Sequence, residues 1–94
     1  MNGPTMHDDA RQTIHIRVLL FAAAAEAHGQ TFADLDLPPG STIGQLRKQL
    51  AAQAPALAPL LPQMLFAVDQ DYASDEQHLT TGSEVACIPP VSGG

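Results

Sequence analysis

The chain has 94 residues, which suits one small domain, and its apolar share of 45% is sufficient for a single hydrophobic core. Ten acidic and four basic residues give a net charge of −6, which argues against nucleic acid or an anionic membrane as a partner and favours a protein with a basic docking face. The single cysteine excludes an internal disulfide, and no apolar run reaches transmembrane length, so we expect a cytoplasmic protein.

Residues 1–12, MNGPTMHDDARQ, are polar and lack the basic head and apolar run of a secretory signal peptide. We expect them to form a disordered amino-terminal extension. His7, Asp8 and Asp9 have the residue types of a metal site. A solvated segment is the favoured interpretation, because a metal site needs fixed geometry and supporting hydrogen bonds.

The first ordered part is predicted to contain two strands and a short helix. Residues 14–21, IHIRVLLF, alternate with the period of a strand. Its outer face ends in Leu19 and Phe21, which indicates either a surface covered by another element or a docking patch. The Ala-rich residues 22–28 predict a short helix that ends at Gly29. Residues 30–37 alternate again and predict a strand antiparallel to the first.

The principal helix is predicted over residues 42–54, TIGQLRKQLAAQA. The sequence Pro38-Pro39-Gly40 predicts a turn before it, Ser41 or Thr42 is a suitable N-cap, and Pro55 ends it. Arg47 and Lys48 have the charge to bind a phosphate, but we interpret them as part of a solvated outer helix face.

The carboxyl-terminal half is predicted to contribute three strands. The segments are residues 64–69, residues 72–73 after a turn at Gln70-Asp71, and residues 84–88 after a turn at Gly82. In the last strand Val85 and Cys87 face one way, and Glu84, Ala86 and Ile88 face the other.

Two groups of residues here have reactive side chains. Asp75, Glu76 and His78 match a metal or acid–base site only in residue type, and without ligand spacing a surface loop is the favoured interpretation. Cys87 is a candidate nucleophile, but it lies within a strand with no His near it in the sequence. A buried, unreactive thiol is therefore favoured.

The sequence ends in Pro89-Pro90-Val91-Ser92-Gly93-Gly94. The two prolines favour an extended path away from the domain. The glycines have no Cβ, so their backbone fits a channel that side chains would block. The four residues after the prolines span roughly 13 Å. We therefore predict that residues 89–94 form a flexible tail that delivers its terminal carboxylate into the active site of a partner.

The order of elements predicts an α+β domain over residues 13–88, with one principal helix on a mixed sheet of four or five strands. If the first and last strands pair in parallel at the centre of the sheet, the arrangement is the β-grasp, or ubiquitin-like, fold.

Four stretches resemble a known family: IRVLLFA, TIGQLRKQLAAQ, LFAVDQDYA and LTTGSEVACIPPVSGG. Together they are similar to the MoaD-type sulfur carriers, the small-subunit family of molybdopterin synthase within the ubiquitin-like ThiS/MoaD group. The resemblance covers residues 14–94, and the final motif is its most specific part. The sequence departs from the family at Asp69, where Asn is usual, and at residues 81–84, where Asp-Gly-Asp-Glu is usual.

The resemblance implies a function for the tail. A MoeB-type, E1-like enzyme would use ATP and magnesium to adenylate Gly94, which follows Gly93, and a sulfur donor protein would convert it to a thiocarboxylate. The sulfur would pass to a cyclic pyranopterin in a MoaE-type large subunit and form the dithiolene of molybdopterin. The chain would be a non-catalytic, sulfur-donating subunit that binds no cofactor or metal itself. The implied partner contacts are Phe21, Tyr72, Ile88, Pro89, Pro90, Val91 and Ser92.

Three other functions fit the same sequence. One is a sulfur carrier for thiamine thiazole or for tRNA thiolation. The second is a ubiquitin-like modifier that is joined to target lysines through Gly94. The third is a plain binding module whose tail has no chemical role.

Overall fold

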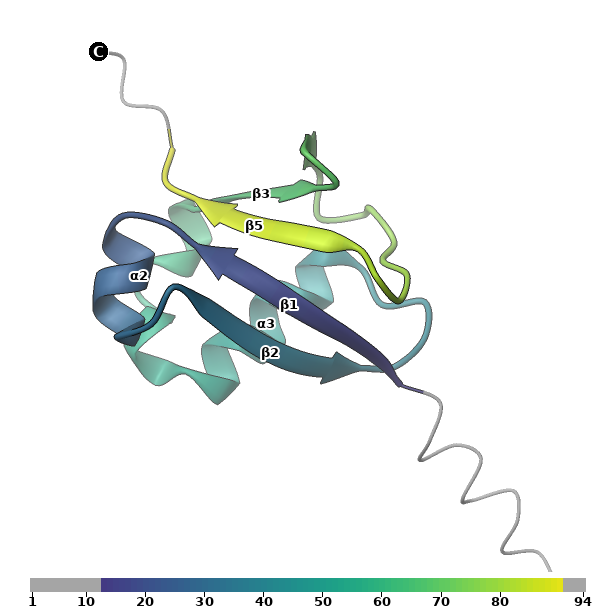
Figure 1. The fold of residues 1–94 in the computed structure, drawn as a ribbon, viewed down its shortest axis with the longest axis horizontal. Helices are drawn as coiled ribbons and strands as arrows, with labels where there is room; N and C mark the ends of the chain where they lie inside the picture. Colours follow the sequence, from purple (N-terminus) through teal and green to yellow (C-terminus); the bar gives the residue numbers. More distant parts are fainter. Residues whose placement is uncertain (1–12, 91–94) are drawn as a thin grey trace, which may run out of the picture.

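The computed structural model of the protein describes residues 13–90, so the extension predicted over residues 1–12 and the last four residues of the predicted tail lie outside the described part. Its centre is one mixed sheet with the strand order β2-β1-β5-β3-β4. β1 and β5 pair in parallel, and the other neighbours are antiparallel (Figure 1). The strands are β1 (Ile14–Leu20), β2 (Phe32–Leu37), β3 (Leu65–Val68), β4 (Asp71–Ala73) and β5 (Glu84–Ile88).

The helices lie on one side of this sheet (Figure 1). They are α2 (Ala23–His28), the principal helix α3 (Ile43–Gln53), and the short 3-10 turns η1 (Pro55–Leu57) and η2 (Leu61–Gln63). Within residues 13–90, no helix is long and apolar enough to cross a membrane.

Both predicted helices are confirmed, and their ends have clear chemical causes. Thr42 is the N-cap of α3, where the Gln45 N–H donates to Thr42 Oγ1 at 3.3 Å and the Thr42 N–H donates to Gln45 Oε1 at 2.8 Å. This reciprocal pair satisfies two N–H groups that the first turn of a helix leaves unpaired. α2 ends at Gly29, whose φ of 84° is the left-handed conformation that glycine adopts without strain.

The core lies between the sheet and α3, as the strand periodicity predicts. The inward side chains of β1, β2 and β5 are buried, and Ile43, Leu46 and Leu50 of α3 are fully covered. Leu79 closes one end of the core from a loop, where its N–H donates to the Ser41 carbonyl at 2.8 Å. The α+β, β-grasp prediction with a parallel central pair is therefore confirmed.

The interpretation of Arg47 as a solvated residue is wrong. Its Nη1 donates to the main-chain carbonyls of Leu61 and Met64, its Nη2 donates to Asp75 Oδ1 at 2.9 Å, and its guanidinium lies 4.8 Å from the Phe66 ring centre. The chain folds back over α3 after the helix ends, so this side of the helix is covered. Lys48, its neighbour, is exposed as predicted.

The turn between β3 and β4 lies one residue earlier than predicted. It is formed by Asp69 and Gln70, both with positive φ, 50° and 77°, and not by Gln70-Asp71. Two central residues with positive φ give the tight hairpin turn whose twist matches that of the strands it joins. Asp71 consequently belongs to β4 and pairs with Val68.

Candidate functional site

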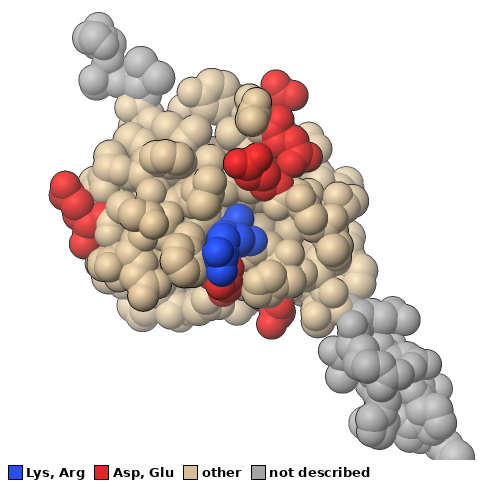
Figure 2. Space-filling model, viewed as in Figure 1, with Lys and Arg blue, Asp and Glu red and all other residues tan. Residues whose placement is uncertain are grey.

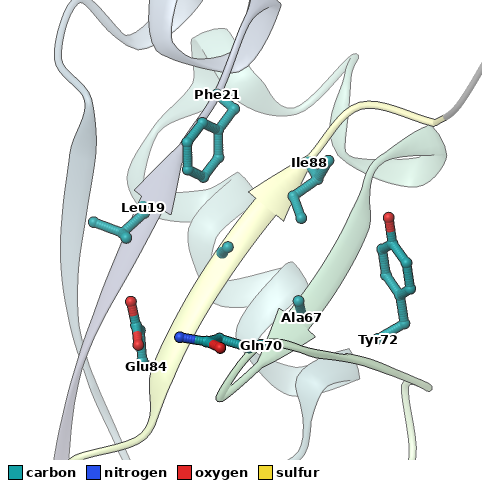
Figure 3. Close-up of a pocket in the computed structure, with 8 residues that line it drawn as sticks. Leu19, Phe21, Ala67, Gln70, Tyr72, Glu84 and Ile88 are labelled. Carbon is teal, nitrogen blue, oxygen red and sulfur yellow. The ribbon is translucent and has the colours of Figure 1, made fainter.

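The face of the sheet opposite the helices carries a hollow of about 340 Å³, which we call the apolar hollow. It extends over β1, β5 and the β3–β4 hairpin (Figure 3). Its lining residues are Leu19, Phe21, Ala67, Gln70, Tyr72, Glu84, Ala86 and Ile88.

Large apolar side chains form most of this hollow. Phe21 is 47% exposed, Tyr72 is 66% exposed, and Ile88 is half-buried. Phe21 is exposed and Leu19 is half-buried, and both line the hollow, so of the two interpretations of that end of β1 the docking patch fits the described residues better. Exposed apolar side chains that gather in one place are typical of protein interaction sites.

The structure brings together three of the predicted partner contacts, which the sequence placed on separate elements. Phe21 follows β1, and its N–H donates to the Cys87 carbonyl at 3.3 Å, which holds it beside β5. Tyr72 belongs to β4 and Ile88 to β5, and both face the same hollow (Figure 3). That these residues contact a partner stays a prediction.

Two polar residues of the hollow, Gln70 and Glu84, were not among the predicted site residues. Their main chains are tied together through Asp69: its N–H donates to the Glu84 carbonyl at 2.7 Å, and its Oδ1 accepts from the Glu84 N–H at 2.9 Å. The period of β5 already placed Glu84 on the same face as Ile88. The sequence placed Gln70 in a turn, but strand periodicity does not say which way a turn side chain points, so its place in the hollow is seen only in the folded hairpin.

A second hollow of about 340 Å³, the polar hollow, adjoins the first and shares Leu19 and Glu84 with it. Its cation is Arg17, whose Nε and Nη2 donate to the two Asp34 carboxylate oxygens at 2.8 and 3.0 Å. The hydrogen bond from Arg17 lowers the pKa of Asp34 below its usual range, and the same bond raises the pKa of Arg17. The guanidinium also lies 4.1 Å from the Phe32 ring centre, so Arg17 is turned toward β2.

The charges on this face are unevenly distributed. Figure 2 shows that uncharged side chains cover most of it, that acidic groups gather over the β3–β4 hairpin, and that basic groups lie near the centre, over β1. The apolar hollow therefore has an acidic border on its hairpin side.

The other chemical candidates have structural roles. Cys87 is fully buried, as predicted, and burial raises the pKa of its thiol to about 11, which supports the interpretation of an unreactive thiol. Asp75, Glu76 and His78 lie on a surface loop as predicted, where Asp75 binds Arg47 and His78 Nδ1 lies 2.9 Å from the Gly40 carbonyl oxygen. The described part of the chain contains no group of three or more His, Cys, Asp or Glu residues that could hold a metal ion.

β5 leads from the apolar hollow toward the tail. Ile88 lines the hollow and is followed directly by Pro89, which is half-buried, and Pro90, which is exposed. Val91, Ser92, Gly93 and Gly94 lie outside the described residues, and the roles assigned to them remain predictions.

Known proteins match this chain over most of its length. The ThiS family model matches residues 18–94. The molybdopterin synthase sulfur carrier subunit of Arabidopsis thaliana is 33% identical over 89 residues, which cover 95% of this chain and 93% of the relative. That of Escherichia coli K12 is 40% identical over 83 residues, 84% of this chain and 99% of the relative. The human protein is 37% identical over 82 residues, which cover 84% of this chain and 93% of the relative.

Solved structures show the same fold. The crystal structure of SAMP1 from Haloferax volcanii superposes with a TM-score of 0.77 at 26% identity, covering 85% of this chain and 99% of that one. The complex of subunits 1 and 2 of the molybdopterin-converting factor from Helicobacter pylori contains a chain with a TM-score of 0.62 at 18% identity, covering 86% and 100%. The chain therefore belongs to the ThiS family, as a ubiquitin-like β-grasp protein whose curated relatives are molybdopterin synthase sulfur carrier subunits.

Proposed function

We propose that this chain is the sulfur carrier subunit of a molybdopterin synthase. The observation that carries the proposal is the position of β5, which lies in the middle of the sheet, borders the apolar hollow and leads directly into Pro89-Pro90. A large subunit that covers the hollow would thus be held next to the segment that ends in Gly93-Gly94. The names of the curated relatives support this function.

The chemistry takes place at Gly94. Its carboxylate is ionised at neutral pH, since a terminal carboxyl has a pKa of about 3.3–3.7, and a carboxylate is a poor electrophile. An activating enzyme joins it to the α-phosphate of ATP and releases pyrophosphate. A sulfur nucleophile then attacks the acyl-adenylate, the bond to AMP breaks, and a C–S bond forms. A thiol then cleaves the bond between this sulfur and the donor, the donor ends as a disulfide, and the product at Gly94 is a thiocarboxylate.

The partners follow from this sequence of steps. The ATP and magnesium are held by the MoeB-type activating enzyme, the sulfur comes from a donor protein, and the MoaE-type large subunit holds the cyclic pyranopterin that receives it. The Helicobacter pylori complex, whose two chains are subunits of a molybdopterin-converting factor, supports a two-subunit assembly. We place these steps in the cytoplasm, where a lone cysteine stays reduced.

Intact mass spectrometry tests the proposal. The chain is incubated with its activating enzyme, magnesium-ATP and a sulfur source, and we expect the mass change of one oxygen replaced by sulfur, located at Gly94. A variant that lacks Gly94, or that carries one residue after it, serves as the control and should stay unmodified while its circular dichroism spectrum is unchanged. An unmodified wild-type chain, or sulfur on the control variants, contradicts the proposal.

A ubiquitin-like modifier is the second candidate. It is favoured by the similarity to SAMP1, whose full name is small archaeal modifier protein 1. Both functions begin with the same adenylation, and they differ in what attacks the activated Gly94. In the same experiment with cell extract added, an isopeptide bond between Gly94 and a lysine identifies a modifier, whereas a thiocarboxylate identifies a carrier.

A further inference from the structure

We propose that the docking partner places a basic side chain, Lys or Arg, at the hairpin end of the apolar hollow, where it pairs with the Glu84 carboxylate beside the Gln70 side chain. This inference rests on the proposed function, since it takes the large subunit as the occupant of the hollow. It specifies the chemistry of that subunit's docking segment: apolar anchors at one end and a cation at the other.

Glu84 has a carboxylate without a cation. Among residues 13–90, no Lys, Arg or His lies within ion-pair distance of it. Arg17 is its direct neighbour in the parallel β1–β5 pairing, yet Arg17 is held by both carboxylate oxygens of Asp34 on the other side. Within the described residues, the Glu84 carboxylate is therefore available to pair with a cation from a partner.

Gln70 adds a second polar group at the same end, with its amide nitrogen turned toward Glu84 (Figure 3). Figure 3 shows its side chain near Glu84, at the opposite end of the hollow from Phe21 and Ile88. The amide makes no hydrogen bond within residues 13–90. Gln70 also has a φ of 77°, a conformation that favours Gly or Asn, so its side chain occupies this place at a conformational cost. Backbone strain of this kind occurs often at binding sites.

The surroundings favour a cation over an anion or a neutral group. Asp69 and Asp71 flank Gln70 in the hairpin, and Glu84 forms the wall shared by the two hollows. Apolar walls next to a carboxylate reduce its contact with water once a partner covers them, which strengthens the attraction to an opposite charge. The net charge of −6 also attracts a basic partner while the two proteins approach each other.

The test measures the affinity of the full chain for the purified molybdopterin synthase large subunit by calorimetry, at about 50 mM and about 300 mM salt. We expect Glu84→Gln to weaken the complex roughly tenfold or more at low salt and to remove much of its salt dependence. Glu76→Gln makes the same change of net charge on an exposed loop residue that lines neither hollow, and it should alter the affinity less than about twofold.

Gln70 is tested separately, with two variants that tolerate its backbone. Gln70→Gly relieves the strain and deletes the amide, so we expect a chain at least as stable to heat that binds several-fold more weakly. Gln70→Asn keeps a carboxamide and the left-handed preference and should retain more of the affinity than glycine. Equal effects of Glu84→Gln and Glu76→Gln, or wild-type affinity of Gln70→Gly, overturn this proposal alone. A wild-type chain that does not bind the large subunit overturns the proposed function as well.

Discussion

Asp69 and Glu84 join the β3–β4 turn to the first residue of β5 through two hydrogen bonds. The Asp69 N–H donates to the Glu84 carbonyl at 2.7 Å, and the Glu84 N–H donates to Asp69 Oδ1 at 2.9 Å. Because Asp69 also has a positive φ, the residue type at this position decides both the turn and its attachment to the sheet.

The stability of Asp69 variants should therefore depend on whether the new side chain keeps a hydrogen-bond acceptor and tolerates a positive φ. Asp69→Asn keeps an oxygen acceptor and tolerates positive φ, so we expect stability close to wild type. Asp69→Ala removes the acceptor and leaves alanine at a positive φ with no side-chain hydrogen bond to offset the strain. We therefore expect the free energy of unfolding to fall by about 1–2 kcal/mol. Urea unfolding measures both variants, and equal stability of the two would contradict the role given to the Asp69 carboxylate.

The apolar hollow should be needed for binding and not for folding. Phe21 is 47% exposed and Ile88 is only half-buried, so Phe21→Ala and Ile88→Lys should unfold at nearly the wild-type temperature. In the complex with the large subunit we expect each to cost about 2 kcal/mol or more, since aromatic and apolar anchors dominate such interfaces. Analytical gel filtration and calorimetry test this expectation. Normal complex formation by both variants would exclude the hollow as the docking surface.

Cys87 should take no part in the sulfur chemistry. With a thiol pKa of about 11, roughly one thiol in a thousand is ionised at pH 8, and the side chain is buried. We expect very slow reaction with a thiol reagent in the native state and rapid reaction in denaturant. Cys87→Ala should still acquire sulfur at Gly94 and should lose about 1–2 kcal/mol of stability through the small cavity it leaves. Loss of sulfur loading in a folded Cys87→Ala chain would give the thiol a role.

Arg47 should be a determinant of stability, unlike the lysine that follows it. Arg47→Met leaves the carbonyls of Leu61 and Met64 without their donor, so we expect the free energy of unfolding to fall by about 2–3 kcal/mol. Lys48→Met removes the same charge from an exposed position and should change the stability by less than about 0.5 kcal/mol. Chemical denaturation of both variants provides the measurement, and similar losses would argue against the hydrogen bonds of Arg47.

The Arg17–Asp34 pair should contribute to stability only while Asp34 is ionised. The hydrogen bond from Arg17 lowers the folded-state pKa of Asp34 below its ordinary value of 3.8. The contribution is therefore complete above about pH 4 and is lost as the pH falls through the lowered folded-state pKa. Asp34→Asn should be slightly less stable than wild type at pH 7, and the difference should vanish near pH 2. The effect should be small, because Arg17 is exposed and Asp34 is only half-buried, so solvent screens the pair. The urea unfolding midpoints of wild type and Asp34→Asn, measured between pH 7 and pH 2, test whether the stability difference falls with pH.

Local chemistry explains why much of the fold was predictable. The alternation of β1 and β5 assigned their core faces, and it also placed Phe21 and Ile88 outward before any pairing was known. The cap at Thr42 and the glycine at the end of α2 are signals carried by one or two residues. The relation of β1 to β5 followed from the order of elements, and it brought the outward residues of two distant segments together.

The parts that sequence reasoning missed depend on contacts between distant segments. Helical spacing put Arg47 beside Lys48 on an outer face, but only the returning chain at Leu61 and Met64 shows that one is covered and the other is not. The one-residue shift of the β3–β4 turn likewise follows from pairing, and it places Asp69 in the turn and Asp71 in β4. No periodic pattern in the sequence carries either fact.

The central place of β5 also constrains how the domain is made. β5 is the last of the described strands to leave the ribosome, yet β1 pairs with β2, and β3 with β4, so the two halves of the sheet meet only through it. A nascent chain that ends before residue 84 lacks the strand that joins the β1–β2 pair to the β3–β4 pair and that contributes Val85 and Cys87 to the core. We therefore expect the complete core of this domain to form only after its central strand has been synthesised.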